Sequence, residues 1–316
     1  MQTAIITAAL VPVILVIALG FFARVSGLVT AGHVSGVERV TYVILFPTLL
    51  FSNLSVATFE GTTVWLLAAA MVMAQIVISV FSWWLFIKQV RAGSIDGPAA
   101  TSAFQGAIRF NTYIALAIVF ALEGERGIQI ASVPLAFIII TVNLFCVAIL
   151  TRHGARPQDV PPPSMLRSIV TNPLIVACVA GLLINPFAID WPMPVERVFD
   201  WFGAAAIALG LFAVGAGLKP ISGQGSVRAI VWSNAIGLIA KPTLFIVLGL
   251  ALALPGNMLA IGLMCMAAPT ATSSFILARQ LGGDAPLMAQ ITTIGTIGSA
   301  ATISVWLGLL PFMAGP

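Results

Sequence analysis

Long apolar segments separated by short polar connections run through the whole chain. A helix that crosses a bilayer needs about 20 predominantly apolar residues. Measured against that length, the pattern predicts ten spans, at residues 4–23, 40–57, 63–87, 100–122, 128–150, 169–187, 201–218, 229–254, 258–278 and 287–310. We therefore expect an all-α polytopic membrane protein.

The longest connection covers residues 151–168 and lies in the middle of the chain. It is rich in proline, and it is far shorter than the roughly 50 residues of a small folded domain. The chain thus divides into two halves, residues 1–150 and 169–316, each with five predicted spans.

The composition excludes several classes of protein. Of 316 residues, 60% are hydrophobic and only 8% are charged, whereas about 25% of the residues in a soluble domain are charged. A soluble enzyme and a disordered chain are therefore excluded, and the expected partner is the lipid bilayer. The net charge of +4 forms no basic stripe for a nucleic acid. The three cysteines lie far apart in apolar runs, so neither a disulfide framework nor a metal site is indicated, and we expect no cofactor.

The basic residues predict an orientation, because cytoplasmic connections contain an excess of Lys and Arg. One set of alternate connections contains ten of these residues, and the other set contains two. This asymmetry places the connection 151–168 in the cytoplasm and both termini on the extracytoplasmic side. We expect a multi-pass protein of the inner cell membrane.

The two halves resemble each other at several positions, which suggests an internal repeat. Because each half has five spans, an odd number, the second copy would insert upside down, as in many secondary transporters. The alternative is coincidence among residues that are common in membrane helices. The matching pairs are Pro12–Gly20 with Pro173–Gly181 in the first and sixth spans, and Asn111–Gly124 with Pro269–Gly282 in the fourth and ninth spans.

The matched positions in the fourth and ninth spans predict broken helices. Pro269 removes one backbone hydrogen bond near the centre of its span, and the hydroxyls of Thr270 and Ser273 can satisfy the freed groups. Asn111 and Thr112 hold the equivalent place in the fourth span. If both spans unwind there, two helix N-termini present partial positive charge to an anion. The alternative is an ordinary proline kink in a packed bundle.

At these residues the chain resembles the auxin efflux carrier family, which includes bacterial malonate and malate permeases and the plant PIN proteins. The resemblance covers nearly the whole chain, and its most specific stretch is MCMAAPTATSSFILARQLGGD. The segments that carry it are residues 11–28, 40–54, 110–127, 171–185, 209–218 and 264–284.

The resemblance implies ten helices in two inverted five-helix repeats, an architecture shared with sodium/proton antiporters and bile-acid symporters. Spans one, two, six and seven would form a scaffold that dimerises through spans two and seven. Spans three to five and eight to ten would form a transport domain with crossing helices four and nine. The implied activity is carriage of an organic carboxylate by an elevator-type motion.

The resemblance also bears on individual residues. Bacterial relatives often have a glycine two residues after the asparagine of span four, where this chain has Tyr113. Bulk beside the implied site therefore leaves the substrate open. Asn143 and Asn53 lie in spans that border the transport site in related proteins, so both could line the cavity.

Two cations, Arg109 and Lys241, fall inside predicted spans, where ionisable residues are costly and are functional candidates. A bound anion would be a natural partner for both. Lys241 could instead neutralise helix C-termini at the crossing, and Arg109 could instead extend to the cytoplasmic surface. All ten acidic residues, including Glu38 just before the second span, are expected in connections or at span ends.

These observations predict a secondary transporter of small organic carboxylates, auxin-like or dicarboxylate. No enzyme motif occurs. The alternative of another class is an intramembrane enzyme, but the histidines and carboxylates that it would need are expected outside the membrane core. A cation antiporter would likewise need carboxylates inside the membrane. The expected substrate site consists of Arg109, Asn111, Thr112, Asn143, Asn53, Lys241, Pro269, Thr270 and Ser273.

Energy coupling is the remaining question. With no Asp, Glu or His expected inside a span, we predict uncoupled movement of the anion, and an interior-negative potential then favours export. A proton- or sodium-coupled importer is the alternative.

Overall fold

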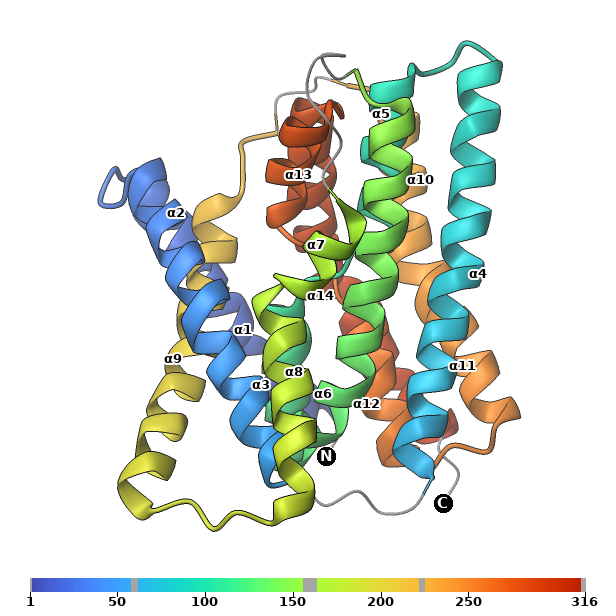
Figure 1. Cartoon of the computed structure of the whole chain (residues 1–316). Helices are drawn as coiled ribbons and strands as arrows, with labels where there is room; N and C mark the ends of the chain where they lie inside the picture. The colour runs from blue at the N-terminus through green and yellow to red at the C-terminus, as the bar shows by residue number, and fades with distance from the viewer. Residues whose placement is uncertain (1, 58–61, 156–163, 222–224, 314–316) are drawn as a thin grey trace.

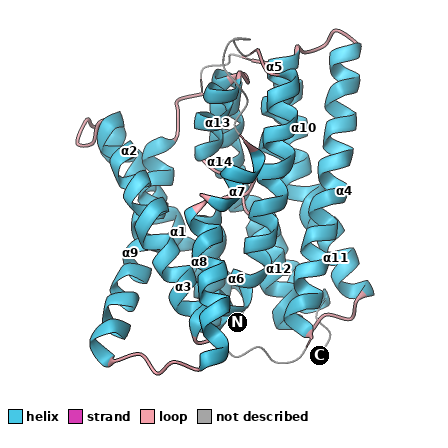
Figure 2. Ribbon diagram, viewed as in Figure 1, coloured by secondary structure: helices cyan, strands magenta, loops and turns pink. Residues whose placement is uncertain are grey.

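The computed structural model describes residues 2–57, 62–155, 164–221 and 225–313, and within these ranges the chain is helical without strands (Figure 2). The predicted connection 151–168 falls partly outside the described residues. The helices are α1 (Gln2–Val25), α2 (Ala31–Val40), α3 (Phe46–Ser55), α4 (Thr63–Arg91), α5 (Gly97–Ile108), α6 (Thr112–His153), α7 (Met165–Val170), α8 (Pro173–Ile184), α9 (Met193–Gly217), α10 (Val227–Ala235), α11 (Lys241–Ala251), α12 (Gly256–Ala267), α13 (Ser273–Leu281) and α14 (Ala285–Met313).

Among the described residues, seven helical segments are long and apolar enough to cross a membrane. This count differs from the ten predicted spans because residues 97–153 form one long helical segment, and because the helices at 173–187 and 256–267 are shorter than the others. The expectation of an all-helical polytopic membrane protein is confirmed. The number of spans stays a prediction.

Two of these segments contain a π-helical turn. The turn η1 (Thr41–Leu45) joins α2 to α3, and η3 (Ile236–Ala240) joins α10 to α11. Pro47 and Pro242 are each the second residue after the turn, and a proline removes a backbone donor and crowds the preceding turn. The wider π turn accommodates this crowding, so each segment stays continuous, from residue 31 to 55 and from 227 to 251.

Two other segments leave the helical conformation in the middle of the bundle. The first break, residues 109–111, separates α5 from α6, and the second break, residues 268–272, separates α12 from α13. The backbone N–H of Asn111 donates to the carbonyl of Pro269 at 2.7 Å. The two breaks therefore lie against each other, and the chain does more than bend at either place.

Glycines with positive φ follow both breaks at similar distances. Gly124 interrupts α6 with φ 61° and ψ −151°, between the predicted fourth and fifth spans. Gly282 ends α13 in the left-handed region with φ 77°. Glycine adopts this region without the penalty of a Cβ atom, so the sequence permits a sharp turn at each of these points.

Close helix packing on one side of the bundle depends on small residues. A Cβ atom on Gly20 of α1 would collide with the carbonyl of Phe212 in α9. A Cβ atom on Gly181 of α8 would lie 2.9 Å from the carbonyl of Phe51 in α3. Small residues allow helix backbones to approach in this way. Figure 1 shows α1, α2, α3 and α9 together on this side, and α4, α10 and α11 on the other side.

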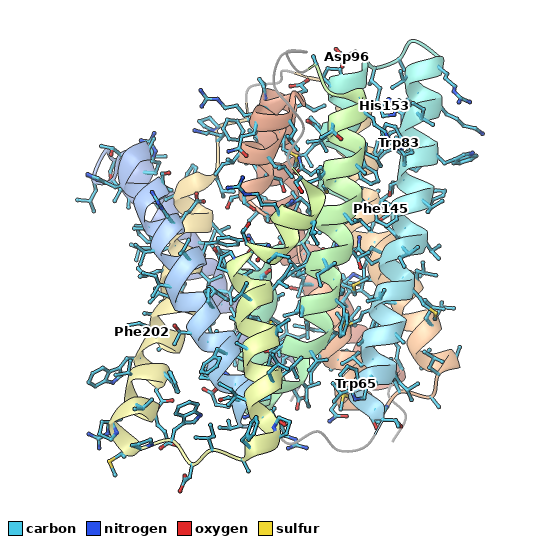
Figure 3. The ribbon with its side chains drawn as sticks, viewed as in Figure 1. Trp65, Trp83, Asp96, Phe145, His153 and Phe202 are labelled. Atoms are coloured by element: carbon cyan, nitrogen blue, oxygen red, sulfur yellow. The ribbon has the colours of Figure 1, made fainter. Side chains whose placement is uncertain are left out.

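The two chain ends lie at the same end of the bundle (Figure 1). Trp83 and His153, whose rings are 4.7 Å apart, lie toward the opposite end together with Asp96 (Figure 3). Trp65 lies toward the end that holds the termini (Figure 3). Tryptophan is enriched where a membrane protein meets the lipid–water interface, so these side chains are suited to the two ends of a membrane bundle.

Candidate functional site

A cavity of about 500 Å³ lies between the helical segment 31–55 and the two breaks, and we call it the central cavity. Helices α6, α8 and α13 complete its wall. Phe145, close to the cavity residue Asn143 in sequence, lies between the labelled residues of the two bundle ends (Figure 3). The polar residues that line the cavity are Ser35, Glu38, Arg39, Tyr42, Arg109, Asn111, Thr112, Tyr113, Asn143, Asn172, Thr272, Ser273 and Gln280.

Arg109 links several predicted site residues. Its Nη1 donates to Oδ1 of Asn143 at 3.3 Å, and its Nη2 donates to Oγ of Ser273 at 3.4 Å. These contacts join the first break to α6 and to the start of α13. Arg109 therefore lines the central cavity, and its remaining N–H groups can donate to an anion. Extension toward the cytoplasmic surface stays the alternative prediction.

Asn111 is almost completely buried and is the N-cap of α6. Its Oδ1 accepts from the backbone N–H groups of Tyr113 at 3.0 Å and Ile114 at 3.2 Å. An asparagine N-cap satisfies donors that a helix start leaves open. Two of the backbone donors at the start of α6 are therefore occupied by Asn111 and are not available to a ligand. Thr112 lines the cavity beside Asn111.

The N-terminus of α13 is more open. Its N-cap residue, Thr272, makes no side-chain hydrogen bond to the backbone of the helix. In the described part of the chain, the backbone N–H of Ser273 has no hydrogen-bond acceptor, whereas those of Ser274 and Phe275 donate to the carbonyls of Ala271 and Thr272. A free N–H at a helix start, together with the partial positive charge there, favours an anion. The second break supplies this backbone site to the cavity, in which Thr272 and Ser273 both take part.

Four predicted site residues do not line the central cavity. Pro269 accepts the Asn111 N–H with its carbonyl, and Thr270 is buried with its hydroxyl 3.4 Å from that of Ser274. Asn53 donates to the Leu49 carbonyl of its own helix at 2.9 Å. Lys241 is fully buried, and its Nζ has no hydrogen-bond partner among the described residues.

Lys241 follows the π turn η3, in which a Cβ atom on Gly237 would lie 3.2 Å from the Ala107 carbonyl at the end of α5. Among the described residues its Nζ contacts neither an acceptor nor the central cavity. Both interpretations of Lys241, as a partner of the anion and as a cation that offsets helix C-termini, therefore stay predictions.

The position of Glu38 differs from the expectation that every acidic residue lies in a connection or at the end of a span. The helix begins at Ala31, about nine residues before the predicted span, so Glu38 and Arg39 lie in a helical segment that is long enough to cross a membrane. Both residues line the central cavity. The sequence signal for this start was Thr30, whose hydroxyl accepts from the His33 N–H in a capping box.

A second cavity of about 360 Å³ borders the central cavity, and we call it the basic cavity. Glu38 and Thr272 line both cavities. The basic cavity is also lined by three cations: Arg24 of α1, Lys219, which follows the end of α9, and Arg279 of α13.

An apolar helical bundle with a polar cavity at two adjoining helix breaks is typical of a membrane transport protein. The chain belongs to the membrane transport protein family, whose sequence pattern matches residues 5–307. This match confirms the resemblance to the auxin efflux carriers. The family is one of transporters, which agrees with the expectation that the chain is not an enzyme.

A relative supports the same assignment. The chain is 26% identical over 241 residues to a protein of Rhizobium meliloti (strain 1021) described as "Putative malonate transporter". The alignment covers 73% of this chain and 72% of the relative. The protein is therefore a multi-pass membrane transporter, and its relative carries the description of a malonate transporter.

Proposed function

We propose that the protein is a secondary transporter of small organic carboxylate anions and that the central cavity binds the substrate. The observation that carries the proposal is the position of Arg109. Its guanidinium lies between Asn143 and Ser273 at the open N-terminus of α13. A guanidinium and the free backbone N–H of Ser273 are well-matched donors for a carboxylate.

The charges of the cavity favour a dicarboxylate over a monocarboxylate. Arg39 lines the same cavity as Arg109, so two guanidinium groups are available for two carboxylates. The volume of about 500 Å³ lies within the usual range of small-molecule sites. The relative's description as a malonate transporter agrees with this choice.

For the substrate, we propose one orientation in the cavity. One carboxylate accepts from Arg109 and from the N–H of Ser273, and Asn111 donates from Nδ2, since its Oδ1 is occupied by the cap of α6. Pro269 and Thr270 do not contact the substrate in this orientation; they stabilise the second break through the hydrogen bonds to Asn111 and Ser274. In this arrangement Lys241 and Asn53 act on the structure of the breaks and of α3 and do not contact the substrate.

An inverted repeat and an elevator-type motion are part of the proposal. The contacts support the repeat: α1 packs on α9 through Gly20, and α8 packs on α3 through Gly181, the two relations that inversion of the first, second, sixth and seventh spans requires. Gly124 and Gly282 likewise both have positive φ. We propose that these spans form a scaffold that dimerises through spans two and seven, and that the remaining spans carry the substrate.

We also propose the predicted orientation, with both termini outside the inner membrane and residues 151–168 in the cytoplasm. The termini lie at one end of the bundle (Figure 1), which fits an even number of spans. Arg24, Lys88 and Arg152 lie in the last turns of helices that lead to the predicted cytoplasmic connections. The central cavity would then open toward the cytoplasm.

Counterflow in proteoliposomes tests the function. Vesicles loaded with unlabelled malonate should accumulate radiolabelled malonate from outside, and a monocarboxylate such as acetate should compete weakly. Arg109→Gln should strongly reduce accumulation, whereas Arg197→Gln, which alters an exposed arginine of α9, should leave it unchanged. Absence of counterflow with malonate and with a panel of other carboxylates would contradict the proposal.

A further inference from the structure

Glu38 lies at the partition between the central cavity and the basic cavity and lines both of them. Its Oε1 accepts a hydrogen bond from Oγ1 of Thr272, the N-cap residue of α13, at 3.2 Å. A Cβ atom on Gly217, at the end of α9, would lie 3.7 Å from the same oxygen. The carboxylate is thus held where α2, α9 and the second break meet.

Among the described residues, Glu38 is the one acidic side chain that lines either cavity. The other titratable groups around it come from every neighbouring element: the phenols are Tyr42 of η1 and Tyr113 of α6. The cations are Arg24 of α1, Arg39 of α2, Arg109 of the first break, Lys219 after α9, and Arg279 of α13. A negative charge at Glu38 is therefore an exception in two otherwise cationic cavities.

The position of Glu38 conflicts with the proposed substrate site. The helix start that would bind the substrate carboxylate already donates the Thr272 hydroxyl to a carboxylate of the protein. Two carboxylates that share one site repel each other, and such a pair is relieved when one of them binds a proton. The ionised side chain occupies a donor that the substrate needs and repels the substrate as well.

We propose that Glu38 is an internal competitor of the substrate, which controls the affinity of the central cavity for organic anions through its own protonation. When Glu38 takes a proton from the aqueous cavity, its negative charge is lost and the Thr272 hydroxyl becomes free to donate to the substrate. When the proton returns to water, the carboxylate reclaims the hydroxyl. This inference rests on the proposed function, because it assigns a role to Glu38 within the same cavity.

The competition predicts a particular pH dependence. At low pH the protonated Glu38 resembles a glutamine, so the KM of the wild type should equal that of Glu38→Gln. As the pH rises and Glu38 ionises, the KM of the wild type should increase relative to that of Glu38→Gln, toward a ratio of about tenfold. A factor of ten corresponds to an interaction between the two carboxylates of about one pKa unit. The maximal rate should change less than KM, because competition acts on binding.

The test measures malonate counterflow in proteoliposomes between pH 5 and pH 8.5 for the wild type and Glu38→Gln. Ionisation of malonate itself affects both proteins equally and cancels in the ratio of KM values. Glu196→Gln, a change at an exposed glutamate of α9, is the matched control and should give a ratio of one at every pH. Thr272→Val should raise KM but keep its pH dependence, because Glu38 can still ionise.

The outcomes separate this inference from the proposed function. No counterflow in the wild type would contradict the function. Counterflow with a KM ratio that is constant with pH would overturn the role of Glu38, because a merely structural effect of the substitution does not titrate. If Glu38→Gln fails to fold by gel filtration, Glu38→Ala, which also removes the charge, takes its place in the KM ratio. The ratio should again rise with pH, and a ratio that is constant with pH would overturn the inference.

Discussion

The two helix breaks occupy corresponding places in the two halves of the chain, but they offer different chemistry. The first break contains the cation Arg109, and Asn111 caps the helix that follows it. The second break contains Pro269, and the helix that follows it begins without a side-chain cap. One break therefore places a charged side chain in the central cavity, and the other places there a backbone N–H, that of Ser273, without an acceptor among the described residues. Corresponding positions in the two halves thus differ in the groups that they present.

The largest effect is expected from the charge of the first break. Arg109→Gln should lower the rate of malonate counterflow at low substrate by about 100-fold, because a hydrogen bond to a charged group contributes about 1.5–3 kcal/mol. Arg109→Lys should lose less, since it keeps the charge but not the forked geometry. Equal losses in the two variants would show that the charge of this break is not what binds the anion.

Two substitutions of Asn111 distinguish its role as the N-cap of α6 from its proposed contact with the substrate. Asn111→Ala should lower malonate transport by about tenfold and destabilise the protein by about 1 kcal/mol, the usual cost of a lost N-cap. Asn111→Asp should keep the cap and the thermal stability but impair transport more, because it places a carboxylate beside the bound anion. Counterflow and thermal unfolding in detergent would be measured together. Normal transport in Asn111→Asp would contradict contact with the substrate.

Side-chain changes in the second break should have smaller effects. Ser273→Ala removes a hydroxyl that accepts from Arg109, but it leaves the backbone N–H at the start of α13 in place. We expect an increase of about fivefold in the KM for malonate, since one hydrogen bond contributes about 1 kcal/mol. An effect as large as that of Arg109→Gln would indicate that the second break binds through its side chains after all.

The smallest effect on transport is expected behind the breaks, at Lys241. Lys241→Met keeps much of the side-chain volume, and the residue does not line the cavity, so KM should change by less than about twofold. Thermal stability should stay equal or rise, because the buried Nζ has no hydrogen-bond partner among the described residues and methionine removes the cost of burying it. A large change in KM with unchanged stability would instead place Lys241 in contact with the substrate.

The sequence predicted much of the fold because several of its determinants are local. Apolar length indicates membrane helices, and a central Pro269 or an Asn111 that can cap a helix marks a break at its own position. Ser273 and Asn143 were also predicted to belong to the site, from a matched break and from the family resemblance. The start of the second segment was missed, because a helix that extends beyond its apolar core is marked by the cap at Thr30 and not by hydropathy.

The sequence by itself determined that this chain is an apolar helical bundle, where its helices break and that Arg109 and Lys241 lie within it. Only the tertiary structure decided which polar groups face one another. Arg109 meets Asn143 across 34 residues and Ser273 across 164 residues. Glu38 accepts a hydrogen bond from Thr272, 234 residues away in the sequence, whereas Lys241 and Asn53 do not line the central cavity. Helix formation and membrane insertion depend on neighbours along the chain, whereas the face that a helix presents to a cavity depends on how all the helices pack.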